Sequence, residues 1–282
     1  MIQVNRIAGG LIDRSQPLDF FFNGQKLSGF AGDTLASALI ANDQKLVARS
    51  FKYHRPRGIF SAGSEEPNAL VELRNGPSQE PNTRATVAEL FDGLEATSQN
   101  HRGSLAFDLM AINDLFSPIL SAGFYYKTFM WPKAFWEKVY EPIIRASAGL
   151  GRLSGDDDPD SYDKGFLHCD VLIIGAGPTG IAAALAAGRA GARVIFADED
   201  FLIGGRLNAE TFEVEGQPGS QWAAQSVTEL NSLSNVRLMP RTSVYGSFDH
   251  GIFGAVERMT DQLLGTLGKP RQVLWRIYSK RA

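Results

Sequence analysis

The pattern of apolar and polar positions divides the chain into three kinds of segment. Short apolar runs bounded by Asn-Gly or Asp-Gly pairs dominate the N-terminal third, and aromatic residues at partly helical spacing follow over residues 105–153. From Asp170 onward, an apolar run, a glycine turn, an alanine-rich stretch and a second apolar run succeed one another. Such changes of period predict changes of fold. We expect an α+β domain followed by an α/β domain.

The N-terminal region begins with a hairpin signal. Residues 18–22 and 25–30 read as strands joined by the pair Asn23-Gly24, which favours a two-residue turn. Asp33 is the expected N-cap of a helix that Asn42 closes. Residues 69–74 read as another strand, and the Asp-Gly pair at 92–93, flanked by 83–91 and 94–98, predicts a second hairpin. Two strands followed by a packed helix are typical of the start of a β-grasp domain.

The stretch from Asp170 to Arg206 resembles a βαβ dinucleotide fingerprint. Gly175 permits a tight turn out of the strand, Gly177 lets the backbone approach a pyrophosphate, and Gly180 lets the helix lie close to the strand. The helix N-terminus then offers free N–H groups to phosphates. Asp198 ends the second strand, where a carboxylate accepts ribose hydroxyls. A nucleotide-free α/β domain with a glycine-rich turn is the alternative.

Composition narrows the possible functions. A length of 282 residues suggests about two domains, and a net charge of −3 gives no basic field for nucleic acid. The one cysteine, Cys169, forms no internal disulfide, cannot hold an iron–sulfur cluster alone, and is expected to be a buried apolar residue. No metal site is expected. The N-terminus lacks the apolar region of a signal peptide and no run is long enough to cross a bilayer, so we expect a cytoplasmic protein.

Two further segments carry less specific signals. In residues 45–58, aromatic residues alternate with cations, which suits a solvated loop, or one that stacks on a flat ring or binds an anion. Residues 105–153 are rich in aromatic residues and interrupted by Pro118, Pro132 and Pro142; core or interdomain packing is the expected role. The expected divisions are 1–103 for the first domain, 104–153 for a helical connector, 154–167 for an acidic linker and 168–282 for the nucleotide domain.

Longer motifs resemble a known family. Residues 32–39, 49–58, 65–70, 122–132 and 241–246 are similar to the α subunit of heterotetrameric sarcosine oxidase, and the resemblance extends over essentially the whole chain. It implies a ferredoxin-like β-grasp domain, here without cluster ligands because no cysteine precedes Cys169, and a Rossmann-type NAD-binding domain. Opine oxidase and hydrogen cyanide synthase subunits share parts of these motifs.

The resemblance also implies cofactors, partners and site residues. FAD and FMN would be bound mostly through the partner subunit, tetrahydrofolate at a C-terminal domain beyond this sequence, and the partners would be β, γ and δ subunits. The implied reaction oxidises the N-methyl group of the small molecule sarcosine, giving glycine, hydrogen peroxide and a one-carbon unit. Thr179 and Arg206 would contact phosphates, Asp198, Glu199 and Asp200 the adenosine ribose, and Val244 the adenine. The residues expected to bind the dinucleotide are therefore Gly175, Gly177, Thr179, Gly180, Asp198, Glu199, Asp200, Gly204, Gly205, Arg206 and Val244.

The sequence departs from the family in its length. After residues 273–280 the family implies a further strand and an Ala-Thr-Gly turn, so we expect a nucleotide domain that is incomplete at its C-terminus and a chain that is inactive alone. No catalytic residue is nominated. The alternatives are a subunit of a related opine or amine dehydrogenase and a truncated, non-functional fragment.

Overall fold

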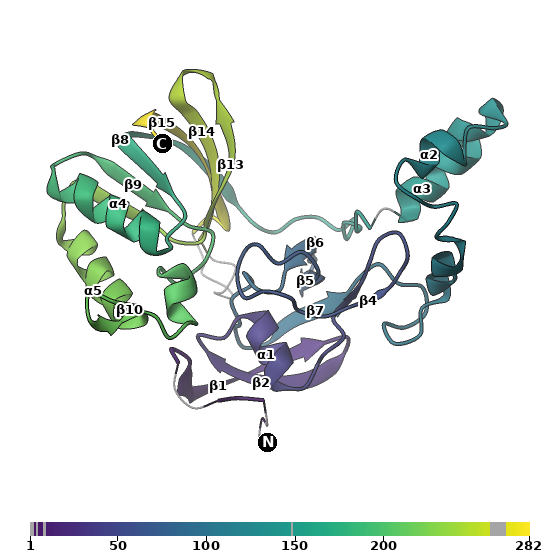
Figure 1. The fold of residues 1–282 in the computed structure, drawn as a ribbon, viewed down its shortest axis with the longest axis horizontal. Coiled ribbons are helices and arrows are strands. Elements are labelled where there is room, and N and C mark those ends of the chain that lie inside the picture. The colour runs from purple at the N-terminus through teal and green to yellow at the C-terminus, as the bar shows by residue number, and fades with distance from the viewer. Residues whose placement is uncertain (1–2, 4, 8–9, 148, 260–268) are drawn as a thin grey trace. The chain divides into compact units, whose positions relative to one another are not determined.

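The computed structural model describes residues 3, 5–7, 10–147, 149–259 and 269–282. The chain divides into two compact units, the first comprising Met1–Ile7 and Asp13–Asp158 and the second Ala8–Ile12 and Pro159–Ala282 (Figure 1). Each unit has its own apolar core. The aromatic-rich segment, expected to be a separate connector, falls within the first unit.

The first unit is built on a mixed five-stranded sheet in the order β2-β1-β7-β5-β6. Its strands are β1 (Asp13–Phe22), β2 (Gln25–Ala31), β5 (Leu70–Asn75), β6 (Ser78–Arg84) and β7 (Leu94–Ser98). The predicted Asn23-Gly24 turn is confirmed: both residues have positive φ angles, and β1 and β2 pair antiparallel around them. The second predicted hairpin is wrong, because β7 pairs parallel with β1 on one side and antiparallel with β5 on the other. Both edges of β7 are therefore occupied by strands distant from residues 83–91.

Helix α1 (Leu35–Ala41) covers the sheet of the first unit. Its N-cap is Thr34 and not Asp33 as we expected: Thr34 and Ser37 exchange side-chain and backbone hydrogen bonds in a capping box. The buried Asp33 carboxylate instead accepts the backbone N–H of Phe30 at 2.9 Å and pairs with Arg6. Asn42 closes the helix as predicted.

The aromatic-rich segment forms short helices in place of one long helix. They are η1 (Leu109–Phe116), α2 (Phe124–Lys127), η2 (Lys133–Phe135), η3 (Trp136–Tyr140) and α3 (Glu141–Ser147). Pro142 lies in the first turn of α3, a position that tolerates proline, so it is not the break that we expected. The expectation of core packing is wrong for several of the large side chains, including Phe107 and Trp131, which are 73% and 82% exposed.

The second unit contains a six-stranded sheet in the order β12-β9-β8-β15-β14-β13. Its strands are β8 (Tyr162–Ile174), β9 (Val194–Ala197), β12 (Val236–Met239), β13 (Thr242–Phe248), β14 (Ile252–Arg258) and β15 (Gln272–Arg281). The strands from β12 to β15 run parallel, whereas β14 and β13 are antiparallel to their neighbours. Strand β8 begins within the stretch expected to be a linker. Residues 273–280, expected to precede a further strand, lie in β15, which itself pairs with β8 from Gln272 to Arg281.

Apolar side chains cover both faces of this sheet. On one face, helices α4 (Pro178–Arg189) and α5 (Gly219–Ser232) pack Ile181 and Leu230 against Phe196 of β9. On the other face Cys169 and Leu172 join a second cluster. The buried position predicted for Cys169 is confirmed, and burial raises the pKa of its thiol. No helix within the described ranges has the length and apolar character needed to cross a membrane.

Candidate functional site

The glycine turn between β8 and α4 is tight on one side and open on the other. Gly175 has a φ of +97°, which an L side chain rarely adopts, and a Cβ atom on Gly180 would overlap the carbonyl oxygen of Gly175. A Cβ atom on Gly177 would meet nothing within 4 Å. Packing within this chain therefore requires glycine at 175 and 180, whereas at Gly177 the open space leaves room for a ligand to approach the backbone.

The N-terminus of α4 faces the same turn without a side-chain cap. Gly177 is the N-cap and makes no capping bond, and Pro178 begins the helix. The first intrahelical hydrogen bond of this turn runs from the Ile181 N–H to the Gly177 carbonyl oxygen, 3.0 Å apart. Backbone N–H groups ahead of Ile181, including that of Thr179, have no intrahelical acceptor, and together with the helix dipole they favour an anion.

Asp198 joins the end of β9 to the glycine turn. One carboxylate oxygen, Oδ2, accepts the backbone N–H of Ala176, and Oδ1 accepts the N–H of Asp200 at 2.7 Å. Burial raises the pKa of Asp198, and the two backbone bonds only partly oppose this. Each carboxylate oxygen retains a second lone pair that can accept a hydroxyl.

Glu199 and Asp200 are held by the neighbouring strands. The carboxylate of Glu199 accepts the Ser243 hydroxyl at 3.4 Å, and its backbone oxygen accepts the Arg258 guanidinium at 2.6 Å. The backbone oxygen of Asp200 accepts the N–H of Arg241 at 2.9 Å. The structure therefore brings all three predicted acids to one edge of the sheet, with Asp198 nearest to the glycine turn.

The Gly204-Gly205 pair packs directly on the glycine turn. The N–H of Gly204 donates to the Ala176 carbonyl oxygen at 2.9 Å, and a Cβ atom on Gly205 would lie 3.1 Å from the Cα atom of Gly177. Both glycines have positive φ angles. Arg206, the next residue, does not reach into the turn: its exposed guanidinium pairs with Glu210, one helical turn along the chain.

Val244 lies on β13, where it pairs with Ala255 of β14. Its partly buried side chain packs against the apolar cluster that contains Ala197 and Met239. Because Ala197 directly precedes Asp198, this position is compatible with the adenine side of the site. The roles predicted for Val244 and Arg206 stay predictions.

An open groove of about 550 Å³ follows the carboxyl end of β8 and the glycine turn. Its lining combines apolar strand residues with Gly175, Gly177, Thr179 and Gly180. The carboxyl edge of a parallel sheet is where α/β folds bind ligands. The candidate acids and the Gly204-Gly205 pair, however, line other surfaces of the turn, so the groove covers only part of the predicted site.

In the first unit, the cationic stretch 45–58 is engaged by the chain itself. The buried Arg49 donates to the carbonyl oxygens of Leu105, Ala106 and His54 at 2.7–2.9 Å. Arg55 pairs with Asp114 at 2.6 Å. Cations at 49 and 55 therefore hold the aromatic-rich segment in place, a role that the sequence did not suggest.

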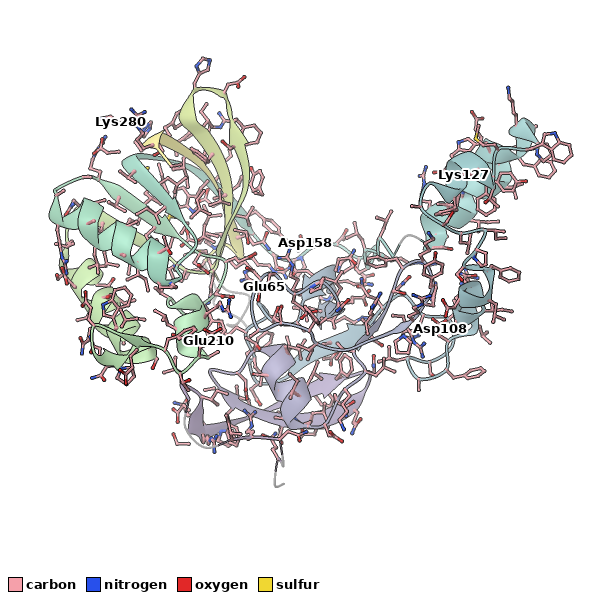
Figure 2. All side chains as sticks on the ribbon, viewed as in Figure 1. Glu65, Asp108, Lys127, Asp158, Glu210 and Lys280 are labelled. Carbon is pink, nitrogen blue, oxygen red and sulfur yellow. The ribbon has the colours of Figure 1, made fainter. Side chains whose placement is uncertain are left out.

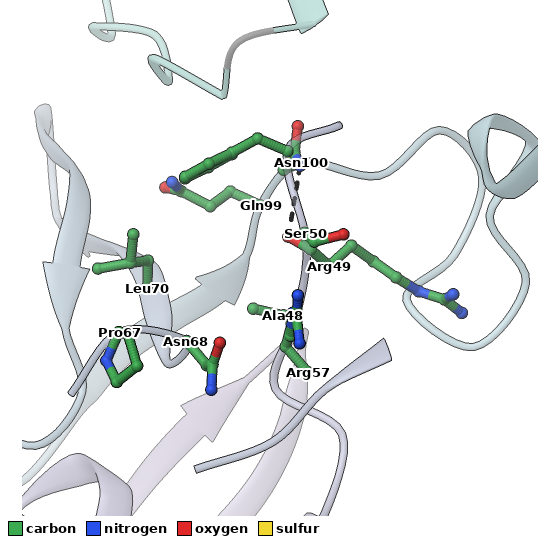
Figure 3. A pocket seen from close by; sticks show the side chains of 10 residues that line it. Ala48, Arg49, Ser50, Arg57, Pro67, Asn68, Leu70, Gln99 and Asn100 are labelled. Atoms are coloured by element: carbon green, nitrogen blue, oxygen red, sulfur yellow. Dashed lines mark hydrogen bonds between the residues drawn. The ribbon is translucent and has the colours of Figure 1, made fainter. Parts of the chain in front are cut away.

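Arg57 differs from these cations. It lines a pocket of about 150 Å³ together with Asn68, Asn100 and the backbone around Ala48, as Figure 3 shows. The Asn100 amide donates to the Arg49 carbonyl oxygen at 3.3 Å, which fixes one wall of the pocket. The pocket is too small for a flavin ring system, so the flavin-interface hypothesis for this stretch gains no support from it.

Two buried acids in the first unit were missed by the sequence reasoning. The Asp108 carboxylate (Figure 2) accepts from His54 Nδ1 at 2.6 Å and from the backbone N–H groups of Arg102 and Met110. The other ring nitrogen of His54 is buried and has no hydrogen-bond partner among the described residues. The second acid is Glu66, within a loop rich in Gly, Ser and Pro. Such loops are usually solvated, so no local signal marked either acid.

Comparison with known proteins agrees with both units. Residues 15–101 match a family model described as a 2Fe-2S iron-sulfur cluster binding domain, and residues 170–242 match an FAD dependent oxidoreductase model. L-proline dehydrogenase from P. horikoshii has a similar structure, with a TM-score of 0.55 and 20% identity over 95% of this chain and 40% of that one. At that identity the likeness shows the fold alone.

Relatives in sequence are more specific. The sarcosine oxidase alpha subunit of Rhizobium meliloti is 56% identical over 97% of this chain and 28% of its own length. The protein of the same name from Corynebacterium sp. strain U-96 is 35% identical, with 24% of its length covered, and an opine oxidase subunit of Agrobacterium tumefaciens is 37% identical over 83 residues, 27% of this chain and 16% of its own. The chain is therefore homologous to the N-terminal region of sarcosine oxidase alpha subunits and spans about a quarter of their length.

Proposed function

We propose that the second unit binds the ADP half of a dinucleotide, with NAD as the ligand. The observation that carries this proposal is the Asp198 carboxylate fixed to the N–H of Ala176 inside the glycine turn. Gly175, Gly177, Thr179 and Gly180 would then surround the pyrophosphate. The acids at 198–200 would receive the ribose hydroxyls, since a carboxylate accepts such bonds.

FAD is the main competitor for the same place. NAD and FAD share the ADP half, and the matching family model describes FAD dependent oxidoreductases. We assign NAD to this unit and assign FAD and FMN to the assembled complex, held mostly through a partner subunit. A folate-binding domain would lie outside the 282 residues.

We further propose that the whole protein is the alpha subunit of a flavin-dependent oxidoreductase acting on the CH–NH group of sarcosine. The supporting observation is the 56% identity to the alpha subunit of a sarcosine oxidase over nearly the whole chain. In this scheme sarcosine yields glycine, hydrogen peroxide and a one-carbon unit. This chain contributes dinucleotide binding and assembly, and we assign it no catalytic residue.

The aromatic-rich segment supports the assembly role. Leu109, Leu115, Trp131 and Ile143 are each more than half exposed. Large exposed apolar patches mark interaction surfaces in proteins. We propose that this segment contacts the beta, gamma or delta subunits of a cytoplasmic complex.

The test uses the full-length protein produced together with the subunits encoded beside it. We expect sarcosine-dependent formation of hydrogen peroxide, and NAD released on denaturation of the complex. A Gly177→Ala variant should lose the NAD, and an Asp163→Asn variant, altered at an exposed position of β8, should keep it. Absence of sarcosine turnover in an assembled, flavin-loaded complex would contradict the proposed activity.

Related substrates are the second candidate, because a subunit of opine oxidase is also similar to part of this chain. Faster turnover of an opine than of sarcosine by the same complex would favour it. Opine catabolism genes beside this one would point the same way, whereas a stop codon followed by the rest of an alpha-subunit sequence would indicate a truncated, non-functional fragment.

A further inference from the structure

The loop spanning residues 60–69 of the first unit folds around the carboxylate of Glu66. Oε2 accepts the backbone N–H groups of Phe60 and Ser61 at 2.7 and 2.6 Å, and the Ser61 hydroxyl at 3.3 Å. Oε1 accepts the N–H groups of Asn68 and Ala69 at 2.7 and 3.1 Å. Glu66 is only 2% exposed. Both ends of the loop are therefore tied to one side chain at its centre.

This carboxylate is held as an anion by dipoles. Burial acts to raise the pKa of Glu66, but the four backbone N–H donors outweigh it and the pKa is lowered. Concave arrays of backbone N–H groups of this kind bind anions, and iron–sulfur clusters are among the anions that they bind.

The matching family model describes a 2Fe-2S domain over residues 15–101, so the fit of a cluster to this loop can be tested on the donor groups. Plant-type [2Fe–2S] sites use thiolates spaced C-x4-C-x2-C, with a distant fourth. In this loop Ser61, Glu66 and Ala69 stand at those intervals, and Ser61 and Ala69 are two of the residues whose N–H groups enclose the Glu66 carboxylate.

A distant residue also reaches the same loop. The Thr86 hydroxyl, on a buried side chain, donates to the Gly63 carbonyl oxygen at 2.7 Å. Thr86 therefore stands where a fourth ligand would come from. Hydroxyl, carboxylate and methyl groups replace thiolates at the four positions, and the chain's one cysteine, Cys169, lies in the other unit. The residues of this loop do not fit a [2Fe–2S] cluster.

We propose that the Glu66 carboxylate has taken the structural place of the cluster in this ferredoxin-like unit. It supplies the internal anion around which the loop closes. The unit is then a scaffold whose cluster loop is held by a side chain, and not an electron carrier.

The first test compares Glu66→Gln with Glu65→Gln in the full 282-residue chain. Glu65 is the adjacent, exposed residue, so its variant is the matched control. A glutamine at 66 offers one acceptor oxygen and turns an NH₂ group toward backbone donors on the other side. The urea midpoint of the Glu66→Gln variant should fall well below that of the wild type, and the control should leave it unchanged. Equal midpoints for the two variants would overturn the proposal.

The second test restores the thiolates in a variant carrying Ser61→Cys, Glu66→Cys, Ala69→Cys and Thr86→Cys. After anaerobic incubation with ferrous iron and sulfide, this variant should take up about two iron and two sulfide ions per chain, as a [2Fe–2S] cluster requires. The wild type should take up none. Stoichiometric iron and sulfide in the wild type would refute the proposal, as would a folded quadruple variant that binds no iron. If the quadruple variant does not fold, the comparison of the two glutamine variants decides.

Discussion

The Asp198 carboxylate accepts the backbone N–H of Ala176, and this bond joins the end of β9 to the glycine turn that follows β8. The carbonyl oxygen of Ala176 in turn accepts the N–H of Gly204 at 2.9 Å. One residue of the turn thus connects three parts of the nucleotide fingerprint. The site is held by the protein's own bonds, so a ligand need not order it.

Replacing Asp198 with Asn should weaken binding of the adenosine half of the ligand. Hydrogen bonds to a charged acceptor contribute about 1.5–3 kcal/mol, which corresponds to roughly tenfold or more in affinity. Calorimetric titration of the full-length protein with ADP would measure the change, with Asp163→Asn as the control. Unaltered affinity in a folded Asp198→Asn variant would show that the ribose binds elsewhere.

The full-length protein should prefer NAD over NADP. A 2′-phosphate near Asp198 and Glu199 would place like charges together, at a cost of about 4 kcal/mol per pair at about 4 Å and an effective dielectric of about 20, before screening. The nearby arginines are committed elsewhere: Arg193 pairs with Asp170 and Arg206 with Glu210. Competition titrations with both nucleotides test this. Equal or tighter binding of NADP would count against it, and FAD copurifying with the isolated alpha subunit would shift the assignment to FAD.

The Gly177→Ala and Gly180→Ala variants should separate binding from folding. The added methyl group at 180 would overlap the Gly175 carbonyl oxygen, and such overpacking costs about 1–3 kcal/mol of stability. The methyl group at 177 meets open space, so that variant should keep its stability and lose affinity for the dinucleotide. Thermal unfolding and ADP titration of both proteins would test the contrast. A stable Gly180→Ala protein would be inconsistent with the close approach of α4 to the turn.

The stabilisation by Glu66 should depend on pH. Its folded-state pKa is lowered from 4.5, so its contribution to stability is present above the unfolded-state pKa and is lost as pH falls through the folded-state pKa. The difference in urea midpoint between wild type and Glu66→Gln should be large at about pH 7 and should shrink below about pH 4. A difference that stays constant over this range would mean that the charge of Glu66 is not the stabilising feature.

Asp108→Ala should destabilise the first unit far more than Asp114→Ala. Removing the Asp108 side chain leaves His54 and two backbone N–H groups without their acceptor in a buried place, and breaking a buried pair in this way costs about 3–5 kcal/mol. Asp114 pairs with Arg55 at the surface, where ion pairs contribute little. Urea unfolding of the two variants measures the difference. Similar midpoints would show that the His54–Asp108 pair is not a stabilising contact.

Local sequence patterns predicted the elements whose determinants are local. Asn23-Gly24 fixes a turn by its own backbone preferences, and the spacing of Gly175, Gly177 and Gly180 fixes the strand, turn and helix of the fingerprint. Pairing between distant strands was not predictable in this way. Residues 94–98 were expected to pair with the segment just before them, but β7 lies between β1 and β5, because the register of a sheet depends on which apolar faces meet in the core.

By itself, the sequence determined the glycine turn, the acids at 198–200 and the absence of thiolates from the first unit, because these follow from residue type and spacing. Only the tertiary structure decided what the buried polar groups do. Arg206 pairs with Glu210, Asp198 binds Ala176, and Glu66 gathers four backbone N–H groups. A buried charge takes whichever partners the fold brings within hydrogen-bonding distance, and spacing along the chain does not encode that choice.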